Sequence, residues 1–429
     1  MNSEAPTTVF STRVPGNRQP NRLTMALDAL GREGAQVIDL TGSNPTLAGF
    51  DYRSDLLQPL AHSRGLTYQP EPRGLPAARR AVAADYARRG VSVDPERITL
   101  TASTSEAYSL LFKVLCDAGD EVLVPTPSYP LFEHLTRLDV VGAVPYELEY
   151  QTAWRVDVGS LERALSERTR AVLAVSPNNP TGSFLHRDEF DAIAELCAAR
   201  GLALIVDEVF ADYVLDDHRA ADRAVPLHDA QCLVFSLAGL SKSIGLPQVK
   251  LGWMAASGPE SLVEEALARL EFACDAYLSA STPVQAAAAD LLEGNARARV
   301  AIQSRVRHND RVLRELISTR PALHALASEA GWSAVVRVPS LASEEDLVVG
   351  LLTHARVLVH PGYFFDFPHE AFLVVSLLAP ESCFAEGLGR VIEYLDSLAA
   401  LGSPGSSGSV TLQGRQTPLD GLGAPGKQP

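Results

Sequence analysis

The chain has 429 residues, 46% hydrophobic and 21% charged, which is enough for two or three domains with buried cores. Its formal net charge of −15, without any run rich in Lys and Arg, argues against nucleic acid or an anionic membrane as the main partner. The scattered cysteines lack C-x-x-C spacing and indicate reduced thiols in a cytoplasmic protein, with no disulfide framework and no metal site; they are Cys116, Cys197, Cys232, Cys274 and Cys383.

The first residues of the chain are polar, with Pro15 and Pro20, and we expect an extended arm there. They lack a basic patch followed by an apolar core, so we expect no signal peptide. No apolar run approaches the roughly 18 residues that a membrane-spanning helix needs. Helical spacing over 22–32 and a short strand over 37–40 follow. A helix over 76–89 begins at a proline and has a glycine just past its end.

Short apolar runs alternate with helical patterns through the middle of the chain. The seven runs cover residues 98–101, 121–125, 140–146, 171–175, 202–206, 233–237 and 252–256. Several are apolar almost throughout, which is typical of strands covered on both faces. The alternation predicts an α/β large domain, with a mostly parallel seven-stranded sheet and helices on both faces. The connection before the last run is short, which leaves an antiparallel direction open for that strand.

The pattern changes beyond residue 259 to long helices, over 260–277, 284–292 and 296–318. A smaller α/β pattern follows, with strands over 333–338, 357–359 and 372–377 and helices over 344–354 and 385–399. Ser, Gly and Pro dominate from 403 onward, which indicates disorder. We therefore expect an N-terminal arm over 1–48 that joins the small domain, a large domain over 49–290, a small C-terminal domain over 291–401 and a disordered tail over 402–429.

Lysine is rare in this chain. It occurs only at positions 113, 242, 250 and 427, so nearly all of the 37 basic residues are arginine. Arginine stays protonated, whereas a desolvated lysine amine can lose its proton and attack a carbonyl carbon. Lys242 follows an apolar run and has small, polar neighbours such as Ser241, at the point where a strand ends and a ligand would meet it. An ordinary surface lysine in a turn is the alternative.

A phosphate site is predicted where residues 101–108 join a strand to a helix. The hydroxyls of Ser103, Thr104 and Ser105 surround the helix start. Unpaired N–H groups and the positive end of the helix dipole favour a phosphate dianion at such a place. Ser103 and Glu106 also have capping-box spacing, so simple capping is the alternative interpretation.

Two further strand ends carry polar side chains. The strand over 171–175 leads into two asparagines held between prolines, and this stiffened turn presents Asn179 at the carboxyl edge of the sheet. The next strand delivers Asp207 to the same edge, where a carboxylate is costly unless a cation or several donors meet it. An Asx turn at Asn179, and a helix cap or an arginine ion pair at Asp207, are the alternatives.

Taken together, these strand ends supply a phosphate cradle, an amide donor, a buried acid and a rare lysine. A phosphorylated pyridine aldehyde needs this set, for its phosphate, ring oxygen, ring nitrogen and aldehyde respectively. The sequence therefore predicts pyridoxal 5'-phosphate (PLP) as cofactor. In that arrangement Asp207 keeps the ring nitrogen protonated, so that the ring can accept electrons from a carbanion.

On these residues the chain resembles the PLP enzymes of fold type I, in the class I/II aminotransferase group, over about residues 30 to 400. The motifs are Ser-Pro-Asn-Asn-Pro-Thr-Gly at 176–182, Asp-Glu-Val-Phe at 207–210, and Gly-Leu-Ser-Lys at 239–242, with a basic residue eight positions on and Gly-Trp at 252–253. The resemblance implies that Lys242 is the Schiff-base residue and proton carrier, that Asp207 pairs with the pyridinium, and that Asn179 bonds the ring oxygen.

The resemblance also implies further cofactor contacts. Tyr129 would stack on the ring and Lys250 would hold the phosphate, where the family more often has Arg. Tyr68 would reach the phosphate of the neighbouring subunit, which implies a homodimer with composite active sites. The full set of implied cofactor-binding residues is Ser103, Thr104, Ser105, Tyr129, Asn179, Asp207, Ser241, Lys250 and Tyr68.

Two positions depart from the family pattern. Phe210 stands where the family has a tyrosine whose hydroxyl touches the ring oxygen. Val374 stands where the family's Arg-x-Ser pattern places an arginine on the substrate's α-carboxylate. Either another arginine takes over, with Arg337, Arg22 and Arg53 as candidates, or the substrate amine lacks an α-carboxylate.

We therefore expect an aminotransferase that moves an amino group between a donor, foremost an amino acid, and a keto acceptor. The partners would be these small molecules, with neither nucleic acid nor a membrane. A β-eliminating C–S lyase on the same fold is the first alternative, because it would use the same cofactor residues. A non-catalytic relative that keeps the cofactor fold is the second.

Overall fold

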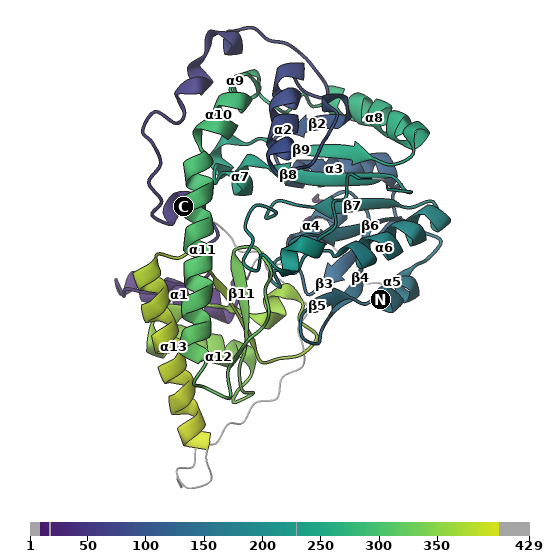
Figure 1. Ribbon diagram of the computed structural model, residues 1–429. Coiled ribbons are helices and arrows are strands. Elements are labelled where there is room, and N and C mark those ends of the chain that lie inside the picture. The colour runs from purple at the N-terminus through teal and green to yellow at the C-terminus, as the bar shows by residue number, and fades with distance from the viewer. Residues whose placement is uncertain (1–8, 17–18, 229, 403–429) are drawn as a thin grey trace.

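The computed structural model describes residues 9–16, 19–228 and 230–402, so the predicted tail from 403 onward lies outside the described residues. The chain forms an eight-stranded sheet with covering helices, and a smaller assembly of helices and short strands beside it (Figure 1). In the described part of the chain, no helix has both the length and the apolar character needed to span a bilayer.

The large sheet agrees with the predicted class but has eight strands where the sequence predicts seven. β9 and the edge strand β5 run against the other six, and β9 pairs antiparallel with both of its neighbours. β5 is the strand that sequence reasoning missed, because its three residues are too few to show a pattern. In spatial order the strands are β2 (Ile98–Thr101), β9 (Gly252–Ser257), β8 (Val234–Gly239), β7 (Ala203–Asp207), β6 (Thr169–Val175), β3 (Glu121–Thr126), β4 (Gly142–Tyr150) and β5 (Trp154–Val156).

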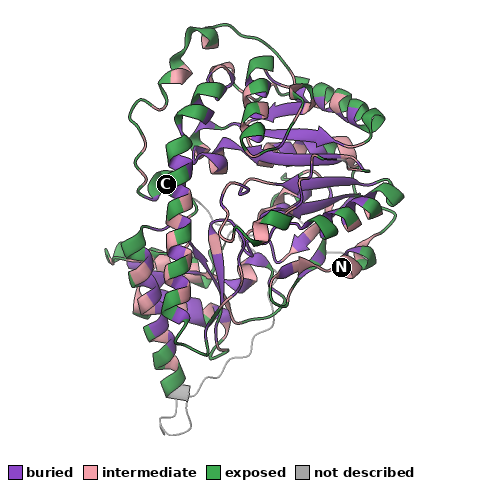
Figure 2. Ribbon diagram, viewed as in Figure 1, coloured by how far each residue is buried: buried purple, intermediate pink, exposed green. Residues whose placement is uncertain are grey.

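Helices cover both faces of this sheet because its central strands are apolar on both sides. Leu204 packs in the cluster that contains Phe190 of α6, whereas the next residue, Ile205, packs with Leu111 of α3. Figure 2 shows the strands buried and the outer helix surfaces exposed. One face carries α3 (Thr104–Leu115), α4 (Leu131–Leu138) and α8 (Glu260–Asp275), and the other α2 (Pro76–Arg88), α5 (Val158–Ala164), α6 (Arg187–Arg200) and α10 (Ala288–Gly294).

The smaller assembly combines C-terminal strands with the N-terminal segment. β1 (Ile38–Asp39) pairs in parallel with β12 (Val357–Leu358), and Arg22 of α1 (Arg22–Arg32) forms ion pairs with Glu345 and Asp346. The predicted helix over 344–354 is α12 (Glu344–Gly350) followed by a π-helical turn. The exact domain boundaries stay a prediction. The remaining elements are β10 (His324–Ala325), β11 (Ser333–Arg337), β13 (His360–Pro361), β14 (Phe372–Ser376), α7 (Leu240–Ser243), α9 (Thr282–Ala286) and α13 (Glu381–Gly402).

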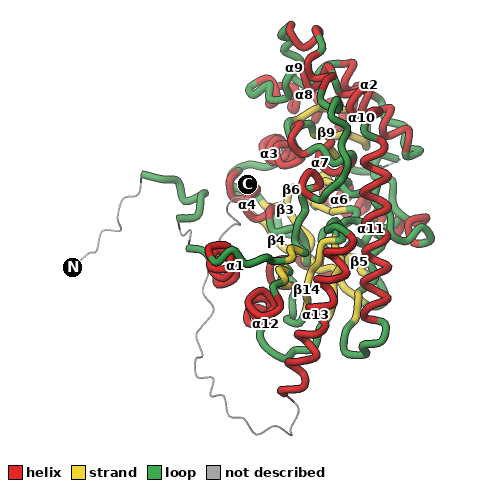
Figure 3. Tube along the Cα trace, turned by 90° about the vertical axis from the view of Figure 1, so that its left-hand side faces the viewer, coloured by secondary structure: helices red, strands yellow, loops and turns green. Residues whose placement is uncertain are grey.

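The helix α11 (Ala296–Ile317) connects the two parts of the molecule. Figures 1 and 3 show it running from α10, beside the large sheet, down to α13. Its apolar residues Ile302, Val306 and Leu313 belong to the core of the smaller part. The buried Asn309 donates hydrogen bonds to the carbonyl oxygens of Leu377 and Ala379, both at 2.8 Å, and so ties the helix to the end of β14.

We expect Asn309→Leu to lower the free energy of unfolding by about 2–4 kcal/mol, because it leaves two buried carbonyl groups unpaired. Urea denaturation followed by circular dichroism measures this loss. Arg311→Leu is the control, since Arg311 is exposed on the same helix, and there the change stays within about 0.5 kcal/mol. Equal stabilities of the two variants would contradict the role given to Asn309.

Candidate active site

Strand register brings the start of α3 beside the turn that carries Lys242. Thr101 of β2 pairs with Gly252 of β9, which in turn pairs with Gly239 of β8. A Cβ atom added to Gly252 would lie 2.8 Å from the carbonyl carbon of Ser103. Glycine is therefore required at 252, because only a residue without a side chain lets the backbone approach the helix start this closely.

The start of α3 is capped as the capping box predicts. The Ser103 hydroxyl accepts the backbone N–H of Glu106 at 3.2 Å, and the Glu106 carboxylate accepts the N–H of Ala102 at 2.6 Å. The hydroxyl of Ser103 is thus engaged in the protein. Thr104 and Ser105 form no side-chain hydrogen bond within the described ranges, so their hydroxyls, with the first-turn N–H groups, remain available to an anion.

Asp207 lies buried at the carboxyl end of β7, as the sequence predicts. One carboxylate oxygen accepts the Tyr108 hydroxyl at 2.7 Å, and the other accepts the N–H of Val209 at 3.0 Å. Burial raises the pKa of Asp207 to about 6, although both hydrogen bonds and the charge of Lys242 act to lower it. Asp207 therefore neither forms an ion pair with an arginine nor caps a helix among the described residues. It is a buried carboxylate that could bind a cation.

Tyr108 is a site residue that sequence reasoning missed. It lies on the buried side of α3, where its ring packs edge-on against Phe132 at 5.4 Å between ring centres. A signal was present, because a tyrosine hydroxyl on an apolar helix face needs a buried partner. The sequence did not say which partner, since Asp207 is 99 residues away along the chain.

Lys242 is half-buried at the end of β8, and its amine points into an aromatic corner. The Nζ atom lies 5.0 Å from the ring centre of Trp332 and 5.6 Å from that of Phe210. It is 3.5 Å from the carbonyl oxygen of Ser43, at the outer limit of a hydrogen bond. Loss of hydration lowers the pKa of Lys242 to about 8, and the negative charge of Asp207 offsets part of this effect.

Asn179 lies in the loop after β6, half-buried, and faces the smaller part of the molecule. Its side-chain oxygen accepts the hydroxyl of Ser333, the first residue of β11, at 3.1 Å. Because Val175 pairs with Asp207 in the sheet, this loop opens at the same edge as the carboxylate. The site is therefore built at a junction, with Trp332 and Ser333 contributed from one side and β6, β7 and β8 from the other.

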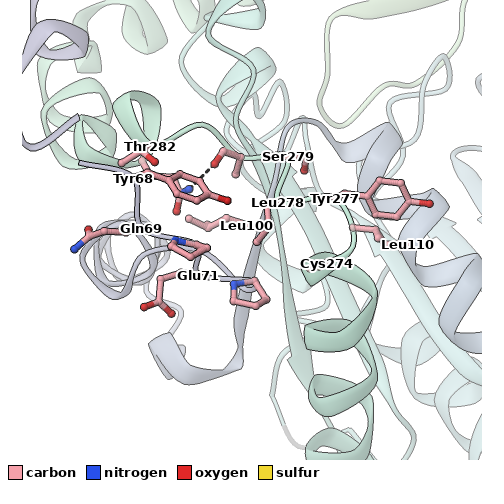
Figure 4. A pocket seen from close by; sticks show the side chains of 14 residues that line it. Tyr68, Gln69, Glu71, Leu100, Leu110, Cys274, Tyr277, Leu278, Ser279 and Thr282 are labelled. Carbon is pink, nitrogen blue, oxygen red and sulfur yellow. Dashed lines mark hydrogen bonds between the residues drawn. The ribbon is translucent and has the colours of Figure 1, made fainter. Parts of the chain in front are cut away.

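The remaining predicted residues lie around this rim. Ser241 is half-buried on α7, and Lys250 is exposed two residues before Gly252, with a left-handed backbone. Tyr129 follows β3 and is 45% exposed. Tyr68 is 71% exposed and lines a pocket with Tyr277 and Ser279 on the outer side of the large domain (Figure 4). That pocket is lined by neither Lys242 nor Asp207, so Tyr68 does not meet the site of its own chain there.

Phe210 packs where the family resemblance expects a tyrosine. Its ring meets Trp332 edge-on at 5.2 Å between ring centres. A tyrosine three residues later bonds the lysine turn itself, since the Tyr213 hydroxyl donates to the carbonyl oxygen of Lys242 at 2.5 Å. Phe210 therefore gives the amine an apolar wall in place of a hydroxyl donor.

Val374 is buried in the core of β14, between Val335 of β11 and His360 of β13, so no cation stands at that position. Arg337 does not supply the missing cation, because it is exposed and lies at one end of β11, whereas Ser333 lies at the other end. Arg22 is held by Glu345 and Asp346, and Arg53 by Asp55. None of the three arginines proposed from the sequence is free beside Lys242.

The arrangement of donors and charges fits PLP. A helix start with two unengaged hydroxyls suits a phosphate, and a buried carboxylate with two donors suits a protonated ring nitrogen. The amine of Lys242, whose pKa is lowered to about 8, suits an aldehyde. The chain would thus hold the cofactor through Thr104, Ser105, Asp207, Asn179 and Lys242.

Comparisons with known proteins agree with this geometry. Residues 37–383 match the model of the family "Aminotransferase class I and II". The alanine aminotransferase of Mycobacterium tuberculosis is 27% identical over 384 residues, which cover 86% of this chain and 87% of that protein. The glutamate-pyruvate aminotransferase of Escherichia coli is 27% identical over 360 residues, covering 81% and 88%. These relatives favour transamination over the lyase alternative.

Solved structures show the same fold. An aminotransferase from Escherichia coli superposes with a TM-score of 0.78 at 24% identity, over 90% of this chain and 98% of that one. The alanine aminotransferase of Pyrococcus furiosus superposes with a TM-score of 0.79 at 23% identity, over 87% and 96%. Because the family match spans most of the chain, the predicted fold type and PLP dependence are confirmed, and the chain belongs to the class I and II aminotransferase family of PLP-dependent enzymes.

Proposed function

We propose that Lys242 carries the amino-transfer chemistry of this enzyme, with Asp207 as the counter-ion of the cofactor ring. The observation that carries the proposal is the pairing of a lysine whose pKa is lowered to about 8 with a buried carboxylate whose pKa is raised to about 6. Perturbed groups of opposite sign in one site are typical of catalytic machinery.

Lys242 provides both a nucleophile and a proton carrier. With a pKa of about 8, roughly a tenth of the amine is neutral at pH 7, far more than for an exposed lysine. PLP, when bound, supplies an aldehyde for amines and a ring that takes up electrons. Once its amine is free, Lys242 would remove a proton from the substrate's α-carbon and deliver it to the cofactor carbon that carried the aldehyde, on the other side of the substrate nitrogen. The rings of Phe210 and Trp332 lie 5.6 and 5.0 Å from the amine and form an apolar wall on one side of it.

Asp207 and its donors orient the ring. Tyr108 and the N–H of Val209 fix the carboxylate, so it is pre-organised to hold a protonated ring nitrogen. The Asn179 amide would donate to the ring oxygen, while its own oxygen is held by Ser333. Tyr129 would cover the ring face.

The phosphate would lie at the start of α3. Thr104 and Ser105 would donate through hydroxyls and backbone N–H groups, and the helix dipole favours the charge. Ser241 and Lys250 stand on the two segments, α7 and the loop before β9, that flank this start. The Ser103 hydroxyl accepts the capping bond from Glu106 and would still have its O–H to donate to the phosphate.

The substrates we propose are an amino acid donor and a keto acid acceptor. The relatives are named for alanine, glutamate and pyruvate, which are small members of these classes. Since Val374 offers no guanidinium, the substrate carboxylate would be met by the backbone N–H groups of Gly42 and Ser43, in the turn that reaches Lys242 through the Ser43 carbonyl.

We further propose that the enzyme is a cytoplasmic homodimer. Large apolar side chains are exposed on the outer side of the large domain, where Tyr68 and Tyr277 share a pocket (Figure 4). Leu66 and Phe272 are exposed on the neighbouring segments. A second copy covering this face would bury them and would bring Tyr68 to the partner's site. All five cysteines are free thiols, which fits a reducing compartment.

We expect Lys242→Ala to abolish the absorbance band of the protein-bound cofactor and to slow amino transfer by about 10²–10⁴-fold, because no amine is left to move the proton. The measurement is a half-reaction with single amino acids, such as alanine and glutamate, followed by absorbance and by assay of the keto acid.

Lys113→Ala is the matched control, because Lys113 pairs with Asp139 on the exposed side of α3. A Lys242→Ala protein with the wild-type band would exclude Lys242 as the reacting amine. Conversion of amines without a carboxylate, but of no amino acid, would overturn the proposed substrate class. Pyruvate and ammonia from a single cysteine-like substrate, without an acceptor, would restore the lyase alternative.

We expect Tyr108→Phe to weaken PLP binding more at pH 6.5 than at pH 8.5. The Tyr108 hydroxyl lowers the pKa of Asp207, so its removal raises that pKa above about 6. More of the carboxylate is then protonated near neutral pH, whereas at pH 8.5 it is ionised in both proteins. We expect the dissociation constant to rise about 3–10-fold at the lower pH, as one charge-assisted hydrogen bond allows.

Equilibrium dialysis at both pH values measures this effect. Tyr146→Phe is the control, because the buried Tyr146 donates to the carbonyl oxygen of Leu173 inside the sheet, away from Asp207. Parallel pH profiles for the wild type and Tyr108→Phe would show that Tyr108 does not tune the carboxylate.

We expect the protein to sediment at twice its chain mass, and Phe272→Glu to shift it toward the monomer, because a charge would be buried in the proposed contact. Phe272 is 84% exposed in the single chain. Leu341→Glu is the control, since Leu341 is partly exposed on the smaller part, away from α8. A wild-type monomer at micromolar concentration would rule out the composite site.

A further inference from the structure

Four side chains hold the turn that carries Lys242, from residue 242 to 245. Tyr213 donates to the carbonyl oxygen of Lys242 at 2.5 Å. Arg299 donates through Nε to that of Ser243 at 2.9 Å. The side-chain amide of Asn295 donates to Ile244 at 2.6 Å, and the hydroxyl of Tyr52 donates to Gly245 at 2.8 Å. Four consecutive carbonyl groups thus receive donors from segments far apart in the sequence.

The need for these donors follows from the shape of the turn. α7 has only four residues. The carbonyl group of Lys242 still accepts the backbone N–H of Gly245 at 3.3 Å, but those of Ser243, Ile244 and Gly245 receive only side-chain donors within the described ranges. The turn then reverses at Gly245, which has a left-handed φ of 69°. A Cβ atom at 245 would lie 2.6 Å from the Tyr52 hydroxyl. Glycine at this position therefore lets Tyr52 reach the backbone.

Arg299 is itself held by two carboxylates. Its NH2 group lies 2.9 Å from Asp85 of α2, and its Nε lies 3.5 Å from Asp212 in the loop after β7. Arg88 bridges the same two carboxylates from the other side. Because the Arg299 side chain is buried among these charges, its Nε has a fixed place from which to donate to the turn.

We propose that Tyr52, Tyr213, Asn295 and Arg299 are positioning residues that fix the Lys242 turn and keep its amine in the aromatic corner beside Phe210 and Trp332. This inference rests on the role proposed for Lys242. It goes beyond that role, because it attributes the position and the protonation of the Lys242 amine to four residues that do not contact the amine. If the four donors served only to pair the carbonyl groups of the turn, the position of the Lys242 amine beside Trp332 would not depend on them.

The positions of two of these residues link the turn to the smaller part of the molecule. Asn295 occupies the N-cap position of α11 and Arg299 lies in its first turns, whereas Asn309 of the same helix bonds the end of β14. One continuous helix therefore contacts both the backbone of Lys242's turn and the small-domain core (Figure 1). A displacement of α11 would act on the lysine directly.

The test measures the pH at which Lys242 becomes reactive. The full chain, freed of PLP, is labelled with trinitrobenzenesulfonate over a pH series, and modification of Lys242 is quantified by peptide mass spectrometry. In Tyr213→Phe and in Tyr52→Phe the turn loosens and the amine gains hydration. We expect the labelling midpoint to rise by about half a pH unit or more in each variant.

Tyr146→Phe is the matched control, since it removes a buried tyrosine hydroxyl that also donates to a backbone carbonyl, but inside the sheet. It should lose a similar amount of thermal stability to Tyr213→Phe and keep the wild-type midpoint. Unchanged labelling midpoints in both Tyr213→Phe and Tyr52→Phe, or an equal rise of the midpoint in Tyr146→Phe, would overturn the inference. Labelling needs no turnover. A wild-type protein without aminotransferase activity, but with the expected labelling midpoints in the variants, would therefore contradict the proposed function and still support the positioning role of the four residues.

Discussion

The site depends on two groups of opposite charge at one edge of the sheet, Asp207 and Lys242, because each charge opposes the effect of burial on the pKa of the other. Burial alone would neutralise both groups, raising the pKa of the acid and lowering that of the amine. Each is kept partly charged by the other, and Asp207 also by Tyr108. Groups whose pKa values are perturbed in this way are typical of catalytic sites.

The fold supplies that edge through strand register. β6, β7 and β8 run parallel, so the loop with Asn179, the carboxylate and the lysine turn all emerge on one side. The antiparallel β9 lies between β8 and β2 and pairs with both. Gly239 of β8 and Gly252 of β9 allow the backbone of β9 to lie close to the start of α7 and the start of α3. A side chain at Gly239 would meet the backbone of Leu251 and Gly252, and one at Gly252 would meet Ser103, so both glycines permit this close packing.

The junction between the two parts of the molecule gives the site its individual character. Trp332 and Ser333 of the smaller part reach Lys242 and Asn179, and Phe210 completes an apolar wall. Val374 adds to this apolar character, because a buried valine stands where the family resemblance expects an arginine. We propose that such a site recognises its substrate less through a guanidinium than through backbone donors and shape.

The sequence by itself determined the strand ends, the motif residues and the family resemblance, because these are local: an apolar run, a glycine or proline, and the polar residue that follows. It also determined that Ser103 caps α3, since capping spacing is short-range. Only the tertiary structure decided that Tyr108 bonds Asp207, that Arg22, Arg53 and Arg337 are not at the site, and that four distant side chains hold the Lys242 turn. Those contacts join residues dozens to hundreds of positions apart, and no local pattern encodes which partners the packing of strands and helices will bring together.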